Sequence, residues 1–287
     1  MREFVITADS TVDLPKEYLE ENGNIILPLS YVLEGKTYED TNGLSPEEVY
    51  EKIRNGALPT TSQINPEQAK EAFEKILKEN KDILHIGFSS GLSGSYNSAR
   101  IAAEELTEEY PGSRIIVVDS LCASMGEGLL LYKVNEMKKQ GRPLEEIGRW
   151  AEDNKLHICH NFTVDDLNHL HRGGRVSKAT AVLGTMVNIK PIMHVDNEGH
   201  LVPIGKVRGR KKSLAGLVER MTEQIEGFDN DMVMISHGDC REEAEYVAEL
   251  VKEKTGIEKV MINFVGPVIG THSGPGTMAL FFMGKER

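Results

Sequence analysis

The sequence predicts an α/β protein with two domains, because strand and helix patterns alternate along its 287 residues and change character once. In the first half, continuous apolar strands separated by helices favour a parallel sheet with flanking helices. In the second half, strand patterns on either side of Asp196-Asn197-Glu198-Gly199 predict a β-hairpin. We therefore expect an N-terminal parallel α/β domain over 1–156 and a C-terminal mixed or antiparallel α+β domain over 157–287.

The first half shows its elements through apolar runs and helix-start signals. Apolar, often β-branched runs predict strands at 4–8, 25–33, 83–88 and 114–118. Helical patterns follow at 15–21, from 46 onward, and at 66–78, 97–109 and 126–139. Asp13 is expected to cap the first of these helices, the pattern Ser45–Glu48 is a capping box, and Asn65-Pro66 supplies an N-cap with proline in the first turn.

In the second half, strands are expected at 158–164, 189–195, 201–207, 231–236 and 259–264, with helices at 213–226 and 241–254. The stretch Gly266–Gly276 is rich in glycine and proline, so we expect a shaped loop there rather than a packed element. His272 lies inside this stretch. A histidine in such a loop is a better candidate for ligand contact than one on a buried strand.

The composition indicates a folded, acidic protein. Hydrophobic residues make up 39% of the chain and the formal net charge is −12, so a core can form but a nucleic-acid partner, which requires a basic face, is not expected. No apolar run approaches the roughly 20 residues of a membrane helix, and no signal-peptide pattern is present. Three separated cysteines fit a reducing compartment. We expect a cytoplasmic protein without membrane insertion.

Polar segments are expected where parallel strands end, which is where open α/β sheets bind ligands. Serine, threonine and glycine also favour turns and helix starts for structural reasons alone, so one such segment would carry little weight. Several on one rim, with hydroxyls and backbone N–H groups at a helix N-terminus, predict an anion site. The segments are Asp9–Thr11, Thr60–Gln63, Ser89–Ser95 and Asp119-Ser120.

An alternative hypothesis comes from Gly87-Phe88-Ser89-Ser90-Gly91, which spells the Gly-x-Ser-x-Gly nucleophile elbow of a serine esterase. That motif needs the serine directly before a helix, whereas Gly91-Leu92-Ser93-Gly94 intervenes here. No spacing of the later histidine and aspartate residues supports a triad. The glycine spacing also matches neither common nucleotide-binding loop.

Two further groups of residues have side chains suited to binding. A histidine and cysteine cluster invites a metal hypothesis, but ordinary core and surface roles are favoured because neighbouring strand positions point to opposite faces; no metal is expected. The cluster comprises His157, Cys159, His160, His169 and His171. Basic patches form either solvated surface or a docking site for an acidic partner. They comprise Arg172, Arg175, Lys178 and Arg208–Lys212.

Taken together, these segments resemble the DegV family of bacterial fatty-acid-binding proteins. The resemblance spans nearly the whole chain, with the motifs in the family's order, although Ile64 stands where the family usually has proline after Thr-Ser-Gln. The matching stretches are Asp9–Leu14, Thr60–Gln63, Ser89–Tyr96, Asp119-Ser120 with Ser124–Gly126, Arg172–Ser177, and Val268–Gly276.

The resemblance implies one long-chain fatty acid, such as palmitate, stearate or oleate, held between the two domains. Thr61 and Ser93 would bind its carboxylate and His272 would lie beside it. Supporting positions in the same loops would be Ser62, Gly94 and Ser95.

The resemblance also implies a carrier that is not an enzyme and needs no cofactor. It would present its ligand to a fatty acid kinase for phosphorylation toward phospholipid synthesis, with the kinase docking near Arg172 and Arg175. An acyl tail gains roughly 0.8 kcal/mol per buried CH₂, so affinity would come mainly from the tail. Candidates to line it are Met186, Met193 and Leu129–Leu131.

Overall fold

The computed structural model describes residues 2–182, 188–285 and 287, and confirms the α/β class. Its first sheet is parallel throughout, with the strand order β2-β1-β6-β7, as expected from the first half of the sequence. The four strands are β1 (Phe4–Asp9), β2 (Ile25–Leu27), β6 (Asp82–Gly87) and β7 (Ile115–Asp119).

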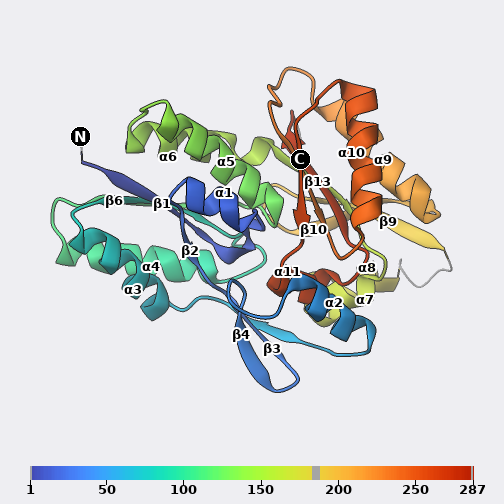
Figure 1. Ribbon diagram of the computed structural model, residues 1–287, viewed down its shortest axis with the longest axis horizontal. Helices are drawn as coiled ribbons and strands as arrows, with labels where there is room; N and C mark the ends of the chain where they lie inside the picture. The colour runs from blue at the N-terminus through green and yellow to red at the C-terminus, as the bar shows by residue number, and fades with distance from the viewer. Residues whose placement is uncertain (1, 183–187, 286) are drawn as a thin grey trace.

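Helices cover both faces of this sheet (Figure 1). Alternate strand residues serve the two faces, since Ile86 packs with the cluster that includes α5 whereas Ile83 packs with α3 and α4. The helices on the α5 face are α1 (Lys16–Glu21), α5 (Met125–Lys139) and α6 (Leu144–Asn154), and those on the other face are α3 (Pro66–Lys78) and α4 (Ser95–Glu109).

The second sheet is mixed, with the order β10-β9-β8-β13-β11-β12, in which only β11 and β12 pair in parallel among the described strands. The predicted hairpin around residues 196–199 joins β9 to β10 and is confirmed. The strands are β8 (Ile158–Thr163), β9 (Ile189–Val195), β10 (Leu201–Arg208), β11 (Val233–His237), β12 (Val260–Phe264) and β13 (Met278–Met283). Helices α9 (Arg210–Gln224) and α10 (Arg241–Thr255) pack on it.

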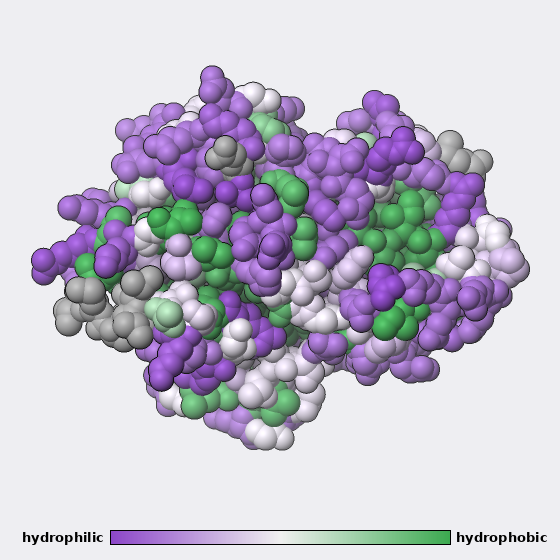
Figure 2. Space-filling model, turned by 180° about the vertical axis from the view of Figure 1, so that it is seen from behind, coloured by the Kyte–Doolittle hydropathy of each residue, from purple (hydrophilic) through white to green (hydrophobic). Residues whose placement is uncertain are grey.

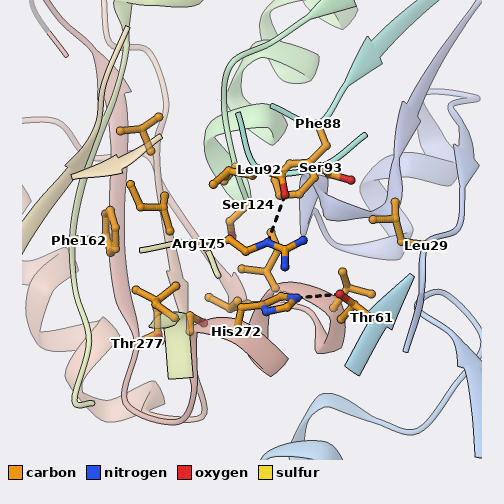
Figure 3. A pocket seen from close by; sticks show the side chains of 18 of the residues that line it. Leu29, Thr61, Phe88, Leu92, Ser93, Ser124, Phe162, Arg175, His272 and Thr277 are labelled. Atoms are coloured by element: carbon orange, nitrogen blue, oxygen red, sulfur yellow. Dashed lines mark hydrogen bonds between the residues drawn. The ribbon is translucent and has the colours of Figure 1, made fainter. Parts of the chain in front are cut away.

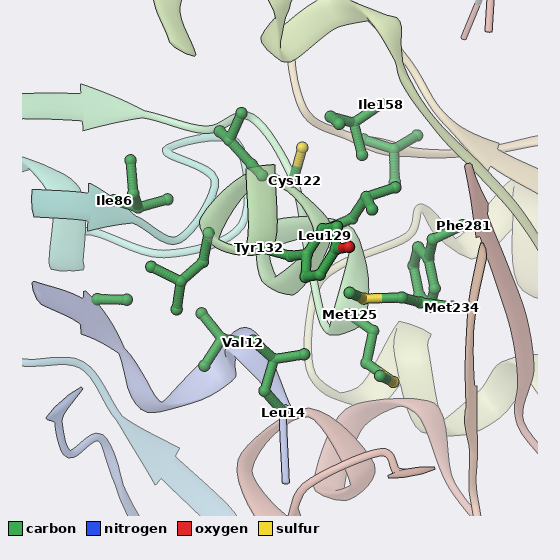
Figure 4. Close-up of a cluster of buried hydrophobic side chains, with 14 of the residues drawn as sticks. Val12, Leu14, Ile86, Cys122, Met125, Leu129, Tyr132, Ile158, Met234 and Phe281 are labelled. Atoms are coloured by element: carbon green, nitrogen blue, oxygen red, sulfur yellow. The ribbon is translucent and has the colours of Figure 1, made fainter. Parts of the chain in front are cut away.

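Helix α5 lies between the two sheets and shares one hydrophobic cluster with both. Figure 4 shows Met125, Leu129 and Tyr132 of α5 between Ile86 of the first sheet and Phe281 of the second. A helix that buries side chains on all sides is typical of a protein centre. This shared core fixes how the two sheets face each other, and with them the loops at the edge of the first sheet.

A third, smaller sheet was not predicted. It is antiparallel, in the order β4-β3-β5, and it comprises β3 (Ser30–Leu33), β4 (Lys36–Glu39) and β5 (Thr60–Ser62). The single strand expected at 25–33 is wrong, because Pro28 separates β2 from β3 and a proline has no N–H to continue a ladder. Thr60–Ser62 therefore belongs to this sheet, and the segment Thr60–Gln63 does not follow a strand of the parallel sheet.

Short helices complete the fold: η1 (Ser10–Val12), α2 (Pro46–Arg54), η2 (Lys155–His157), α7 (Leu167–Arg172), α8 (Lys178–Val182) and α11 (Pro267–Ser273). The capping box at Ser45 and the N-cap at Asn65 are confirmed, and Asn65 forms a capping box with Gln68 as well. The cap at Asp13 is wrong, since Asp13 has a positive φ of 51° and Pro15 precedes α1. The loop expected at 266–276 is also wrong: Pro267 starts α11, because its fixed φ suits a first helical position.

The two large sheets use residues on either side of position 156, and the division into domains at that point stays a prediction. Helix α11 from the second half packs on α2, β3 and β5 from the first. Among the described residues, no helix combines the length and apolar character that a bilayer crossing requires. The face in Figure 2 is largely hydrophilic, with hydrophobic side chains in separate patches.

Replacing Gly128 of α5 with alanine should lower the free energy of unfolding by about 1–3 kcal/mol. A Cβ there would lie 2.6 Å from the Val12 carbonyl oxygen. Gly216→Ala on α9 is the matched control, since its Cβ meets only Ile192 at 3.7 Å, and the usual helical preference for alanine should raise stability by up to about 1 kcal/mol. Urea denaturation measures both; equal stabilisation would contradict the packing.

Candidate functional site

A cavity of about 370 Å³ lies between the two large sheets, within the size range of small-molecule sites. Both halves of the chain contribute to its wall. Figure 3 shows Thr61 on one side of the cavity and Phe162 on the other, with His272 and Arg175 between them. The apolar lining consists of Leu29, Phe88, Leu92, Ala123, Phe162, Leu170, Val195, Leu201, Val265, Val268, Ile269 and Phe281.

Thr61 and His272 meet at the polar end, although 211 positions separate them in sequence. Thr61 Oγ1 lies 2.7 Å from His272 Nε2. Strand β5 presents Thr61 and the last turn of α11 presents His272. Burial and the nearby Arg175 lower the pKa of His272 to about 4, so its imidazole is neutral near pH 7 and one ring nitrogen carries a proton.

Ser93 reaches the same end of the cavity because Gln63 ties β5 to the start of α4. The Gln63 amide oxygen accepts from the Gly94 N–H at 3.1 Å, and a Cβ at Gly94 would lie 2.5 Å from that oxygen. Ser93 Oγ lies 3.0 Å from Ser95 Oγ, which accepts from the Ile64 N–H at 3.3 Å. Ser62 also lines the cavity. Of the predicted residues, Thr61, Ser62, Ser93 and His272 line the cavity, whereas Gly94 and Ser95 lie behind its wall.

The two predicted docking arginines lie in different surroundings. Arg172 is exposed and its guanidinium lies 2.7 Å from His169 Nδ1. Arg175 is half-buried, lines the cavity, and donates to the carbonyl oxygens of Leu92 and Gly173. A Cβ at Gly173 would lie 2.1 Å from His272 Nδ1, so this turn can lie against the imidazole only because residue 173 is glycine.

The apolar end was missed by sequence reasoning. Leu129–Leu131 and Met193 lie in the main hydrophobic cluster and do not line the cavity, while Met186 lies outside the described residues. The wall is formed instead by strand residues such as Phe162, Val195 and Phe281. Apolar side chains on strands cannot be divided by sequence between core and cavity, since both environments select the same residue types.

Ser89, the proposed nucleophile of the esterase hypothesis, is fully buried. Its Oγ donates to the Gly199 carbonyl oxygen at 2.9 Å, beneath the β9–β10 turn, and accepts from the Gly91 N–H at 3.2 Å. A nucleophilic serine requires a histidine base within hydrogen-bond reach. The hydrogen bonds of Ser89 instead connect the β9–β10 turn to the loop that carries Ser93.

The residues described by the structure contain no group of three or more histidine, cysteine, aspartate or glutamate side chains placed to hold a metal ion. His160 belongs to the cavity wall instead. Its Nε2 accepts from the Ala123 N–H at 3.2 Å and its Nδ1 lies 3.0 Å from the Ile158 carbonyl oxygen. Both ring nitrogens are therefore already engaged within the protein.

Comparison with known proteins assigns the family. The model described as "Uncharacterised protein, DegV family" matches residues 3–285. The chain belongs to the DegV family. A DegV domain-containing protein of Clostridium perfringens is 43% identical to this DegV chain and aligns with 100% of it and 99% of its own length.

Solved DegV structures superpose over almost the whole chain. The fatty-acid-binding DegV family protein of Thermus thermophilus is 31% identical with a TM-score of 0.88, covering 99% of this chain and 100% of its own. A stearic acid-binding protein of Eubacterium ventriosum is 25% identical with a TM-score of 0.90, covering 98% of each chain. DegV of Bacillus subtilis, described as a fatty acid binding protein, is 30% identical with a TM-score of 0.85, covering 99% and 100%.

Buried carboxyl groups of this DegV chain accept hydrogen bonds from backbone N–H groups of its loops. Asp9 Oδ2 accepts from the Phe88 N–H at 2.9 Å, which fixes the start of the loop that carries Ser93. Burial raises the pKa of Asp9 to about 7. Asp13, Asp40 and Glu127 also have raised pKa values, in each case chiefly through burial. Sequence patterns for turns and caps gave no signal that distinguishes these acids from surface ones.

Asp9 should make stability depend on pH. The folded state keeps its proton up to about pH 7, whereas an unperturbed aspartate releases it near 3.8. The unfolded state thus loses protons first, and the free energy of unfolding due to this group falls between about pH 4 and 7. The stability of wild type relative to Asp9→Asn should fall by on the order of 3 kcal/mol over that range. Urea unfolding at several pH values tests this; a pH-independent difference would contradict it.

Proposed function

We propose that this protein binds a long-chain fatty acid, with the carboxylate at the Thr61, Ser93 and His272 end of the cavity and the tail along its apolar wall. The observation that carries the proposal is a largely apolar cavity that Thr61, Ser93 and His272 also line, with Thr61 Oγ1 2.7 Å from His272 Nε2. The solved DegV relatives described as fatty-acid-binding proteins support the same class of ligand.

The hydrogen bonds at the polar end can orient two hydroxyl protons toward an anion. If His272 Nε2 carries its ring proton, it donates to Thr61 Oγ1 and leaves the Thr61 hydroxyl proton free. Because Ser95 Oγ already accepts from the Ile64 N–H, its own proton can go to Ser93, which frees the Ser93 proton. Each chain of donors polarises its last hydroxyl, so both suit a carboxylate.

The tail supplies most of the affinity. At roughly 0.8 kcal/mol per buried CH₂, a sixteen-carbon chain contributes on the order of 10 kcal/mol before the costs of association. Neutral hydroxyl donors then bind the carboxylate without placing a fixed positive charge directly against it. The Arg175 guanidinium lies in the same wall and adds long-range attraction.

The direct test is to identify the lipid that purifies with the protein. Organic extraction of protein expressed in bacteria, followed by mass spectrometry, should yield long-chain fatty acid in near-stoichiometric amount. Delipidated protein should then bind palmitate or oleate. A protein that carries no fatty acid and, after delipidation, shows no measurable affinity for either acid would overturn the proposal.

The double change Thr61→Ala with Ser93→Ala should weaken palmitate binding roughly 10- to 100-fold, because two charge-assisted hydrogen bonds are lost. Displacement of a fluorescent fatty acid measures the affinity. Ser90→Ala is the matched control, since Ser90 is an exposed hydroxyl in the same loop. Equal affinities for all three proteins would rule out these head-group contacts.

We further propose that the bound acid is presented to a fatty acid kinase, which phosphorylates it toward phospholipid synthesis, and that the protein itself performs no chemistry. The proposal is supported by where two arginine side chains lie. The exposed Arg172 lies on α7, next to the turn through which Arg175 reaches the cavity. A cationic surface beside the head-group end suits an acidic docking face. Reconstitution with a bacterial fatty acid kinase tests the step.

Arg172→Glu should raise the kinase KM for the loaded carrier roughly tenfold while leaving palmitate affinity unchanged, since rim charges act on encounter rather than on the ligand. Lys139→Glu, the same charge change at the end of α5, should leave the KM unchanged. A KM that both variants alter equally would point to net charge rather than to docking at α7.

A further inference from the structure

Residues of helix α11 line part of the cavity wall, yet the helix is short and lacks a side-chain N-cap. It has only seven residues, Pro267–Ser273, and helices this short have little stability of their own. Its N-cap residue is Gly266, which has no side chain to accept a hydrogen bond from the first turn. The placement of α11 must therefore be set by other segments.

Asp40, which follows β4, supplies the missing cap from a distant part of the chain. Its Oδ1 accepts from the Val268 N–H at 3.1 Å, and its Oδ2 accepts from Ser10 Oγ at 3.0 Å. Ser10 Oγ in turn accepts from the Leu29 N–H at 3.0 Å. The Asp40 carboxyl group thus ties the first turn of α11 to η1 and to the segment that leads into β3.

Other contacts fix the chain just before the helix. The Gly266 N–H donates to the Asp13 carboxyl group, and a Cβ at Gly266 would lie 2.6 Å from Asp13 Oδ1. Tyr50 Oη donates to the Val265 carbonyl oxygen at 2.9 Å. In the first turn itself, the Val268 side chain packs in a hydrophobic cluster and its N–H donates to Asp40.

The opposite end of α11 carries His272, whose Nε2 lies 2.7 Å from Thr61 Oγ1. A short helix moves as one piece, so a change of tilt at Val268 shifts His272 relative to β5. Asp40 does not line the cavity. Any influence of Asp40 on the ligand therefore passes through the segments that it bonds, which are α11 and the segment of Leu29, a residue that lines the cavity.

We propose that Asp40 is a positioning residue: by capping α11 it sets His272 against Thr61 and so gives the cavity its preference for a carboxylate over an uncharged head group. This inference rests on the proposed function and names the residue that controls head-group selectivity. A purely structural role would instead change binding of acidic and neutral lipids together.

The experiment compares palmitate with 1-hexadecanol, which has the same tail length and no carboxylate. In the wild type, palmitate should bind more tightly. Asp40→Ala should lower the palmitate-to-hexadecanol affinity ratio roughly three- to tenfold while hexadecanol affinity changes by less than about twofold. Asp40→Asn should restore most of the ratio, because its amide oxygen can still accept from the Val268 N–H.

Nitrogen NMR of the His272 ring supplies a readout independent of affinity, and its signals should shift in Asp40→Ala and stay near wild type in Asp40→Asn. Asp153→Ala, which removes an exposed acid from α6, is the control and should keep both the ratio and the spectrum. If Asp40→Ala does not fold, Ser10→Ala replaces it, since it removes the hydroxyl that holds Asp40 Oδ2, and it should lower the ratio by a smaller factor.

An unchanged ratio in Asp40→Ala, or in Ser10→Ala where that variant is used, would overturn the inference. A loss in Asp40→Asn as large as in Asp40→Ala would overturn it as well. A wild type that binds neither lipid, or binds both equally, would instead contradict the proposed function.

Discussion

The hydrogen bond between Thr61 and His272 joins the two halves of the chain at the polar end of the cavity, and the arrangement of the site depends on it. Neither residue is held by a regular element of the large sheets. Thr61 lies on the small third sheet and His272 on a seven-residue helix. Their 2.7 Å contact therefore depends on the segments that hold the third sheet and this helix in place. The Gln63 bond to Gly94 adds Ser93 to the same group.

Under the proposed function, the cavity combines two physical effects, one on the tail and one on the head group. The apolar wall supplies affinity without direction, because burial of a hydrocarbon tail depends on area rather than on angle. The hydroxyl groups supply direction, because hydrogen bonds are short and angle-dependent. The buried carboxyl groups lie behind the loops and accept from backbone N–H groups, as Asp9 does from Phe88, while the Thr61 and Ser93 side chains line the cavity.

Sequence reasoning recovered the parts of this protein that depend on local signals. Strand and helix alternation predicted the parallel sheet, and Asn65-Pro66 predicted the start of α3. It failed where a distant contact overrides the local signal. Gly266–Gly276 has the composition of a loop, but residues 267–273 form a helix because Asp13, Asp40 and α2 hold them.

In the candidate site, too, sequence reasoning found the residues that lie in local motifs and missed those that depend on the fold. The family motifs pointed to Thr61, Ser93 and His272, and all three line the cavity. The tail-lining side chains could not be found in this way, because Phe162 and Phe281 differ from core residues only in what lies beside them. Asp9 and Asp13 fell within a family motif, but their burial was not predicted, because burial is a property of the fold and not of the residue type.

A crystal structure of the protein with bound palmitate tests the central claim most directly. The account predicts one carboxylate oxygen within hydrogen-bond distance of each of the Thr61 and Ser93 hydroxyls, with the tail running toward Phe162 and Phe281. A ligand bound in the reverse direction, or bound outside this cavity, would contradict it.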